Sequence, residues 1–317
     1  MSDAVQLGLF GEAQTDMDGE TQVEWSYSRR QTLEQCTRRY YFDYYGAKAR
    51  LASADPQKKD IRFLSTLSNC YLRSGVILHS AIRSFYKYGD SSGKWLVSWA
   101  QRLYRTDHDY SCSGTGIPTA GQRYSPAVLL EFHYRMPDAE ARYTESEERL
   151  ARNLGNFLTS PAYAAMRCPE QRASAKVEER ISLKTPMFGA RGKVDLALRQ
   201  SGKLAIVDWK TGEAEESTES LQLAFYALWA AETEGCCLED ISLYRGQLTD
   251  GSLRPVALDD HILLRVRARI IQDLERMRVL DRYGRDAVAE VFPPCSFPRV
   301  CKLCPYQGIC VAPLRRS

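Results

Sequence analysis

Residues Gly189–Tyr226, GARGKVDLALRQSGKLAIVDWKTGEAEESTESLQLAFY, contain the pattern that decides the fold. Two runs with strand-like alternation, Val194–Leu198 and Leu204–Trp209, flank the turn-prone tripeptide Gln200-Ser201-Gly202. Alternating runs on either side of a short turn predict a β-hairpin. A helix should follow from about Glu216.

Charged side chains gather at the end of this hairpin. Asp195 lies on the first strand, while Asp208 and Lys210 end the second strand and share one face because side chains alternate with a period of two. On the following helix, Gln222 and Tyr226 are four residues apart and share a face. Burying Asp and Lys is costly unless they pair or bind a metal. The cluster is therefore either an ion pair on a surface hairpin or a divalent-metal site.

The order of these residues resembles the RecB/AddB-type branch of the PD-(D/E)XK nuclease superfamily. The matching motifs are G-x-x-D (Gly192, Asp195), D-x-K-T (Asp208, Lys210, Thr211) and Q-x-x-x-Y (Gln222, Tyr226). With further matches on both sides, the resemblance covers about Ser26 to Cys310. It implies an α/β fold with a restriction-endonuclease-like core, in which helices flank a mixed central sheet, and a metal-dependent DNA nuclease activity.

Two upstream segments extend the resemblance. SYSRRQTLEQCTRRYYFDYYG, which begins at Ser26, is similar to the family's opening signature, although Thr37 replaces the usual proline. We expect one helix here, from Ser26 or Ser28 to about Tyr45. A second helix, from about Ile61 to Tyr88, carries a G-x-x-x-H element that ends at His79.

The resemblance implies a role for each site residue. Asp195 and Asp208, with His79 and an upstream acid, would hold Mg²⁺ or Mn²⁺, while Lys210 would position the attacking hydroxide. Gln222 and Tyr226 would brace the site or touch the substrate backbone.

The upstream acid lies on a strand expected at Ala175–Leu183. Family position favours Glu178 for this role. Alternation instead places Glu179 on the apolar face. We favour Glu178 as the third acid and keep Glu179 as the alternative.

The remaining segments complete a single nuclease domain at 26–317, preceded by a flexible tail at 1–25. We expect helices at Trp95–Arg105, Pro126–Tyr134, Ala139–Leu158 and about Asp259–Leu280, and strands at Ile241–Gln247 and Leu253–Leu258. A helical insertion would occupy about 90–170, the nuclease core about 171–282, and a metal-binding C-terminal segment 295–310.

Ten cysteines in a chain expected to be cytoplasmic argue against a disulfide scaffold. Cys301, Cys304 and Cys310 have C-x₂-C-x₅-C spacing, and the family resemblance supplies Cys36 as the fourth ligand of a [4Fe–4S] cluster. A Zn²⁺ ion with the same four ligands is the alternative, and Cys295 is a possible substitute ligand.

Charge is unevenly distributed along the chain. The net charge is only +3, yet the segment from Arg29 to Arg105 contains 15 Lys/Arg and 5 Asp/Glu, a local charge of 15 − 5 = +10. A basic, tyrosine-rich segment beside an acidic metal site suits a polyanion. We therefore expect Arg38, Arg39 and Tyr40 to follow a DNA strand by charge and stacking, the alternative being a solvated helical surface.

The acidic tail contains one apolar patch. Gln6, Leu7, Leu9 and Phe10 match the Q-L-x-L-F order of the bacterial sliding-clamp-binding pentapeptide. Such an anchor could dock into a hydrophobic pocket of the clamp, or it could fold back onto this protein's own core.

Several classes of protein are not expected. The chain lacks a G-x-x-x-x-G-K-[ST] loop, so we expect no ATP-driven motor, and no apolar run reaches the length of a membrane span. The favoured interpretation is a nuclease that acts on single-stranded DNA or DNA ends in repair, recombination or defence. The alternative is a catalytically inactive DNA-binding accessory module stabilised by a four-cysteine metal site.

Overall fold

The strands form one five-stranded sheet in the order β1-β2-β3-β4-β5. They are β1 Lys176–Lys184, β2 Gly189–Gln200, β3 Lys203–Lys210, β4 Ile241–Gln247 and β5 Ser252–Val256. Neighbouring strands are antiparallel except β3 and β4, which are parallel. Helix α10 (Glu216–Glu234) joins these two, since parallel neighbours need a long crossover connection. The predicted α/β architecture with a mixed central sheet is confirmed.

The β2–β3 hairpin closes through a two-residue turn. Gln200 pairs with Lys203, and the intervening Ser201 and Gly202 have φ angles of 52° and 83°. Positive φ at both central residues is the geometry of a type I′ turn, whose twist matches that of the flanking strands. The hairpin therefore forms where its sequence pattern predicts it.

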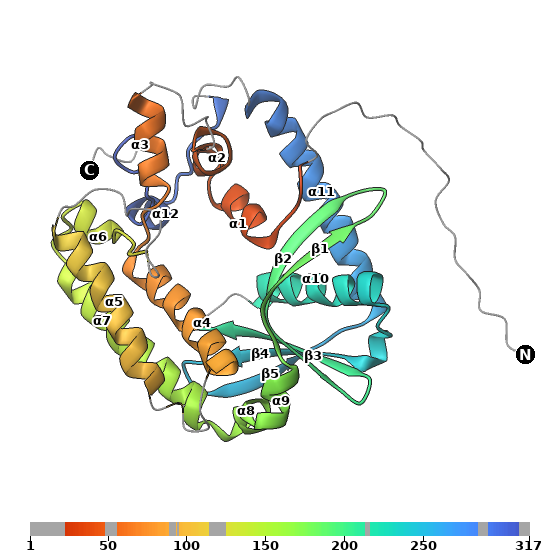
Figure 1. The fold of residues 1–317 in the computed structure, drawn as a ribbon. Helices are drawn as coiled ribbons and strands as arrows, with labels where there is room; N and C mark the ends of the chain where they lie inside the picture. Colours follow the sequence, from red (N-terminus) through yellow and green to blue (C-terminus); the bar gives the residue numbers. More distant parts are fainter. Residues whose placement is uncertain are drawn as a thin grey trace, which may run out of the picture.

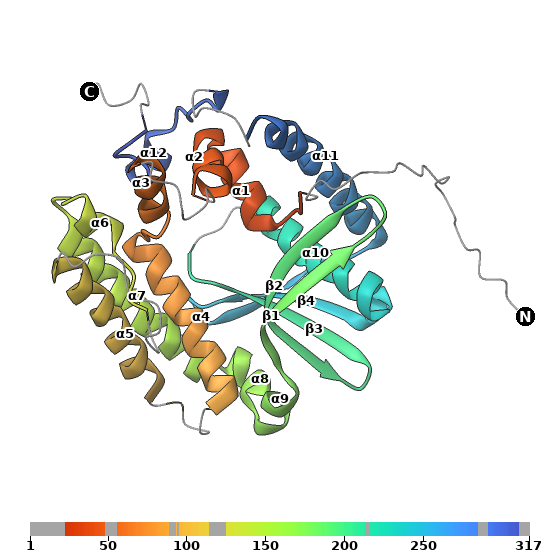
Figure 2. The same cartoon turned by 45° about the horizontal axis from the view of Figure 1, so that its top comes forward.

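Helices cover both faces of the sheet. They are α1 Tyr27–Gln35, α2 Thr37–Tyr41, the π-helical turn η1 Phe42–Gly46, α3 Pro56–Leu64, α4 Cys70–Tyr88, α5 Trp95–Ser113, α6 Leu130–His133, α7 Ala139–Thr159, η2 Pro161–Tyr163, α8 Ala164–Arg167, α9 Pro169–Ser174, α10, η3 Leu238–Asp240, α11 Asp260–Gly284 and α12 Pro298–Lys302. Helices α10 and α11 bury one face of the sheet, while α4, α5 and α7 bury the other (Figures 1 and 2).

A third apolar cluster lies beside the sheet. It joins Phe42 of η1, Ile61 and Leu64 of α3, and Tyr306 near the C-terminus. Figure 1 shows α2, α3 and α12 in this region, although they are far apart in sequence. The N-terminal helices and the cysteine-rich C-terminal segment thus share a small core of their own.

Two of the predicted helices are each divided into two in the structure. The single helix expected from Ser26 or Ser28 to Tyr45 is wrong, because Cys36 is extended (φ −165°, ψ 114°) and separates α1 from α2. The expected helix at Ile61–Tyr88 is likewise two helices, since α3 ends at Leu64 and α4 begins at Cys70.

The computed structural model describes residues 23–47, 56–88, 93, 95–113, 125–212, 216–284 and 291–310. The predicted clamp-binding residues Gln6, Leu7, Leu9 and Phe10 lie outside these ranges. Within them, no helix combines the length and apolar composition needed to cross a bilayer.

Candidate active site

Five elements bring the predicted site residues together. They are β1 with Glu178, β2 with Asp195, β3 with Asp208 and Lys210, α10 with Gln222 and Tyr226, and α4 with His79. Residues from separate parts of the chain meet because α4 packs across one face of the sheet and α10 across the other. Every member of the predicted set has a polar contact with another member.

Three of these residues form a carboxylate–histidine cluster. Nδ1 of His79 lies 3.1 Å from Oε1 of Glu178 and 3.3 Å from Oδ1 of Asp195. One ligand atom from each of the three lies within 4.8 Å of the other two. Two carboxylates and an imidazole are suitable donors for Mg²⁺ or Mn²⁺. The cluster therefore offers a partly assembled cation site.

Asp208 adds a buried carboxylate beside this cluster. Its side chain is 2% exposed, and Oδ2 forms an ion pair with Nζ of Lys210 at 2.6 Å. Burial raises the pKa of Asp208 to about 6, against the opposing effect of Lys210 and with a further rise from Asp195. Burying a carboxylate is costly, and the raised pKa indicates that the ion pair with Lys210 offsets only part of that cost. A bound cation would offset more of it, so these residues fit the metal that the sequence predicts.

The charged residues of the cluster shift one another's pKa values. Burial alone would lower the pKa of His79, but the charges and hydrogen bonds of Asp195 and Glu178 raise it to about 10. Burial alone would raise the pKa of Asp195, yet His79 and the backbone N–H of Trp209, which donates to Oδ2 at 2.9 Å, hold it below its usual range. The metal-free protein therefore supplies the positive charge itself, as an imidazolium.

A chain of hydrogen bonds holds Lys210 in place. Its Nζ donates to Oε1 of Gln222 at 2.9 Å, and Nε2 of Gln222 donates to the hydroxyl of Tyr226 at 2.8 Å. That hydroxyl in turn donates to the backbone carbonyl of Lys193 at 2.7 Å. Helix α10 thus fixes the ammonium beside Asp208 and ties it to strand β2.

Strand β1 changes face at Glu178, which has a φ of 54°. Val177 packs against the α4–α5–α7 side of the sheet, whereas Ile181 packs against the α10–α11 side. Simple alternation, which kept Glu179 open as the third acid, fails here because it assumes an unbroken strand. The structure places Glu178, and not Glu179, in contact with His79.

Two neighbours of the site escaped sequence reasoning. Lys193 forms an ion pair with Glu178, and its only signal is that it precedes Asp195 by two residues on β2. The hydroxyl of Tyr71 lies 3.3 Å from Oγ1 of Thr211, 140 residues away, so no local pattern could reveal it.

The predicted DNA contacts are wrong for two of three residues. Tyr40 is 0% exposed and its hydroxyl accepts a 2.8 Å hydrogen bond from Nε of Arg29, so its ring cannot stack on a base. Arg38 is buried and donates from Nε to the backbone carbonyl of Phe292 at 2.5 Å. Both side chains stabilise the fold. Only Arg39 keeps partial exposure.

The cysteines predicted as ligands meet at a second site. Cys36, Cys301, Cys304 and Cys310, together with Cys295, line a cavity of about 230 Å³, here called the cysteine pocket. The break between α1 and α2 turns Cys36 toward the C-terminal segment, and its sulfur accepts a 3.4 Å contact from the backbone N–H of Cys295.

The cysteine pocket is wider than a zinc site. Tetrahedral Zn²⁺ with four thiolates requires sulfur atoms about 3.8 Å apart. The sulfurs of Cys295 and Cys301 lie 3.7 Å apart, but no three cysteines of the described chain have sulfurs within 4.8 Å of one another. Burial also raises the pKa of the Cys304 thiol to about 12. Five cysteines around one pocket are compatible with a metal cluster held by cysteine ligands.

Comparison with known proteins gives one family match. A profile of the PD-(D/E)XK nuclease superfamily matches residues 24–311. Among solved structures, a provisionally named exonuclease from Eubacterium rectale is 13% identical at a TM-score of 0.42, covering 88% of this chain and 87% of that one. The protein SSO0001 is 17% identical at a TM-score of 0.30, covering 58% of this chain and 78% of that one. No curated protein matches. At these TM-scores neither structure adds to the description of the fold.

Proposed function

This chain belongs to the PD-(D/E)XK nuclease superfamily, and on that premise we propose that it is a metal-dependent deoxyribonuclease. It would hydrolyse phosphodiester bonds as an exonuclease, in single-stranded DNA or at DNA ends. One observation carries the proposal. The buried carboxylate of Asp208, whose pKa burial raises, lies in the same site as the cluster of His79, Glu178 and Asp195.

Asp195, Asp208, Glu178 and His79 would hold Mg²⁺ or Mn²⁺. When bound, the ion supplies Lewis-acid stabilisation of the phosphate and lowers the pKa of a water molecule. His79 would give up its proton on binding, since only the neutral imidazole is a ligand. The carboxylates come from adjacent strands, so their positions are set by the sheet and not by a loop.

Lys210 would act on the nucleophile and the phosphate. Its ammonium is held by Gln222 and lies 2.6 Å from Asp208, so it can donate a hydrogen bond to an attacking oxygen and offset negative charge as the bond breaks. Gln222 and Tyr226 serve as positioning residues, because their contacts reach Lys210 and the β2 backbone.

We expect Glu178→Gln to lower the rate of cleavage by at least about 100-fold, as for loss of one preorganised charged group in an active site. Glu179→Gln is the matched control, since it makes the same change at the next residue of the same strand, and its rate should stay within about twofold of wild type. The measurement is the initial rate on end-labelled single-stranded DNA with Mn²⁺ or Mg²⁺, and with a chelator. Equal rates for the two variants, or cleavage that persists in chelator, would contradict the proposal.

The cysteine pocket would hold a [4Fe–4S] cluster through Cys36, Cys301, Cys304 and Cys310, with structural Zn²⁺ as the alternative. Its support is the family resemblance together with the width of the pocket. Such a group would have a structural role, because the pocket joins the first helices to the C-terminal segment.

Residues 6–10 would bind a bacterial sliding clamp, with Leu9 and Phe10 providing most of the buried area. Tethering of this kind would raise the local concentration of a nuclease at DNA. A fluorescent peptide of residues 1–20 should bind purified clamp with about micromolar affinity, and the Leu9→Ala, Phe10→Ala peptide should bind at least about tenfold more weakly. Indistinguishable binding by the two peptides would remove this partner.

A further inference from the structure

Three potential metal ligands meet on the outer helices, remote in sequence from both sites described above. His108 and Cys112 are four residues apart on α5 and share a face, and Glu140 begins the facing helix α7. Nε2 of His108 lies 3.3 and 3.2 Å from the two oxygens of Glu140 and 3.7 Å from Sγ of Cys112. One ligand atom from each residue lies within 4.8 Å of the other two.

Two of these separations are close to the edges of a zinc tetrahedron. Ordinary Zn–N, Zn–O and Zn–S bonds at tetrahedral angles place nitrogen and oxygen about 3.4 Å apart, and nitrogen and sulfur about 3.6 Å apart. The distances from Nε2 of His108 to Glu140 and to Cys112 are 3.2 and 3.7 Å. The two edges that meet at His108 therefore already have nearly the length that one bound ion would impose, and the donor atoms of Glu140 and Cys112 lie within 4.8 Å of each other.

The histidine ring is held with Nε2 toward the other two donors. Its ring packs on Phe132 and Tyr143, with centroids 4.9 and 4.3 Å away. Nδ1 lies 3.5 Å from a carboxylate oxygen of Asp109. When Nε2 binds a metal, the ring keeps its proton on Nδ1, where the Asp109 carboxylate can accept a hydrogen bond from it.

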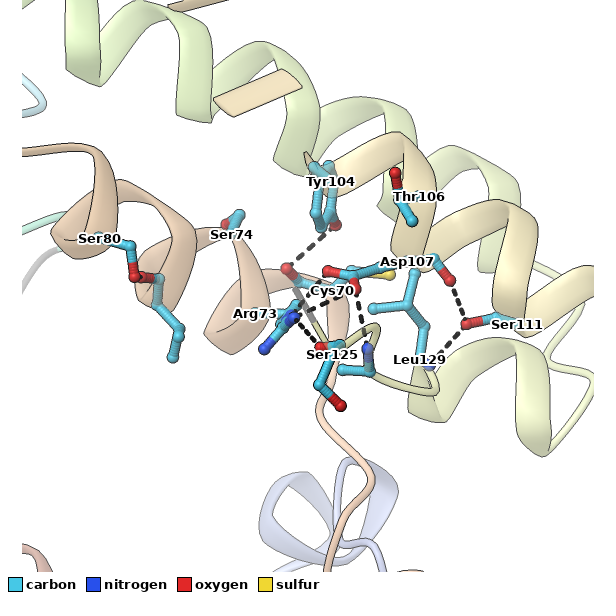
Figure 3. A network of polar contacts seen from close by, with 12 residues as sticks. Cys70, Arg73, Ser74, Ser80, Tyr104, Thr106, Asp107, Ser111, Ser125 and Leu129 are labelled. Carbon is cyan, nitrogen blue, oxygen red and sulfur yellow. Dashed lines mark hydrogen bonds and ion pairs between the residues drawn. The ribbon is translucent and has the colours of Figure 1, made fainter. Parts of the chain in front are cut away.

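The turn of α5 that carries two of the ligands is anchored on its inner side (Figure 3). Asp107, which is 0% exposed, accepts hydrogen bonds from Nε of Arg73 at 2.6 Å and from the backbone N–H of Ala127 at 2.8 Å. Ser111 accepts from the backbone N–H of Leu129 at 2.8 Å and donates to the backbone carbonyl of Asp107 at 2.6 Å. The outward-facing donors thus stand on a rigid turn, as a preorganised ligand set requires.

We propose that His108, Cys112 and Glu140 bind one Zn²⁺ ion, with water as the fourth ligand. A thiolate and an imidazole select zinc over Mg²⁺, which prefers the oxygen donors of the active site. Binding takes up Cys112 as its thiolate and releases the thiol proton to solvent.

The ion would join α5 to α7. Helix α7 also carries Arg149, whose guanidinium lies 4.9 Å from the ring centroid of Tyr71, the residue in contact with Thr211 of the D-x-K-T motif. The bound ion would therefore cross-link two helices of the layer that borders the active site. It would contribute no group to the chemistry.

The test is a zinc titration of the full-length protein in excess Mg²⁺, which occupies the carboxylate site. Wild type is compared with Cys112→Ser and His108→Gln. The matched controls are Cys237→Ser and His261→Gln, which remove an exposed cysteine and an exposed histidine elsewhere. Because the cysteine pocket is intact in all five proteins, its metal content cancels in the comparison. Co²⁺ serves as a second probe, since a thiolate ligand gives it a charge-transfer absorption.

We expect wild type and both controls to bind one more equivalent of zinc than Cys112→Ser and His108→Gln, whose affinity at this site should fall at least about 100-fold. Asp109→Asn, which alters only the partner of Nδ1, should weaken binding about tenfold. The thiolate–Co²⁺ band should decrease in Cys112→Ser and not in Cys237→Ser. Equal zinc stoichiometry and affinity in wild type and Cys112→Ser would overturn the proposal.

Discussion

At the scale of single residues, Asp208 is suited to binding a cation but destabilises the folded, metal-free protein. Its carboxylate is buried, and burial raises its pKa to about 6 from the ordinary 3.8 although Nζ of Lys210 lies 2.6 Å away. The folded, metal-free protein therefore holds a proton on Asp208 more tightly than the unfolded chain does. Its free energy of unfolding must fall as the pH rises from about 4 to about 6, as far as this residue contributes.

We accordingly expect Asp208→Asn to stabilise the metal-free protein above pH 7 while abolishing cleavage. The gain should be about 1–3 kcal/mol, since each pKa unit corresponds to about 1.4 kcal/mol and the lost attraction to Lys210 offsets part of it. It should fall below about 1 kcal/mol near pH 4, where wild-type Asp208 is protonated in the folded protein and about 40% protonated in the unfolded chain. Urea denaturation in chelator at pH 4 and pH 8 measures both values.

Glu275→Gln, an exposed change on α11, is the control and should shift neither value by more than about 0.5 kcal/mol. A destabilised Asp208→Asn protein at pH 8 would show that the buried charge is well compensated without metal.

At the scale of elements, the packing of α10 on β2 determines the geometry of Lys210. A Cβ at Gly192 would lie 2.8 Å from Cε1 of Phe225 and 3.0 Å from Cε1 of Tyr226. Real Cβ contacts are not that short, so α10 can lie this close to β2 only because residue 192 of the G-x-x-D motif is glycine. The close packing of α10 places Gln222 within hydrogen-bond distance of Lys210.

Gly192→Ala should therefore destabilise the protein by about 1–3 kcal/mol through overpacking, and it should slow cleavage by moving α10. Gly75→Ala makes the same chemical change inside helix α4, where nothing lies within 4 Å of the added methyl. It should stabilise the protein by about 0.5–1 kcal/mol, because alanine favours a helix. Thermal denaturation and initial cleavage rates report both effects, and a shift of the same sign in the two variants would contradict this account.

The sequence predicted the elements whose pattern lies within one short stretch. It did not predict the points at which a helix breaks or a strand changes face. The hairpin around Ser201-Gly202 follows from a period of two and a turn, both readable within about 20 residues. The face change at Glu178 depends on contacts with α4 and β2, which no local pattern contains. The break at Cys36 is also tertiary, since nothing in a helix-compatible run requires an extended residue there.

At the scale of the whole molecule, the cysteine pocket is held by contacts between distant segments. The hydroxyl of Thr37 donates to the backbone carbonyl of Pro293 at 2.6 Å, and that of Tyr306 donates to Asp43 at 2.5 Å. Thr37, which replaces the proline of the family signature, thus supplies a contact that proline could not make.

We expect Cys304→Ser to lose bound iron and at least about 2 kcal/mol of stability together, because metal binding contributes to folding. Cys168→Ser, outside the pocket, should retain both. Iron and zinc are measured in anaerobically purified protein, with denaturant midpoints alongside. Stoichiometric zinc without iron in wild type would favour the alternative metal, and an unchanged metal content in Cys304→Ser would exclude this ligand.

The C-x₂-C-x₅-C spacing predicted cysteines that the structure places around one pocket, whereas the excess of positive charge led us to expect Arg38 and Tyr40 at DNA. Arg38 is buried beside a segment more than 250 residues away, to which it donates a hydrogen bond, and Tyr40 is buried in the core that contains α10 and α11. Charge alone shows that a segment is basic, and it cannot show which of its side chains the fold covers.

The long separation between the two halves of the cysteine pocket also sets an order in time. The residues that meet in the active site lie between positions 79 and 226, whereas the hydrogen-bond partner of Thr37 lies 256 positions further along the chain. At ribosomal speeds of about 5–20 residues per second, on the order of 10–50 s pass between the synthesis of Thr37 and that of its partner. Every residue of the candidate active site is thus synthesised before the pocket can close. During translation, the thiol of Cys36 stays uncovered until its C-terminal partners leave the ribosome.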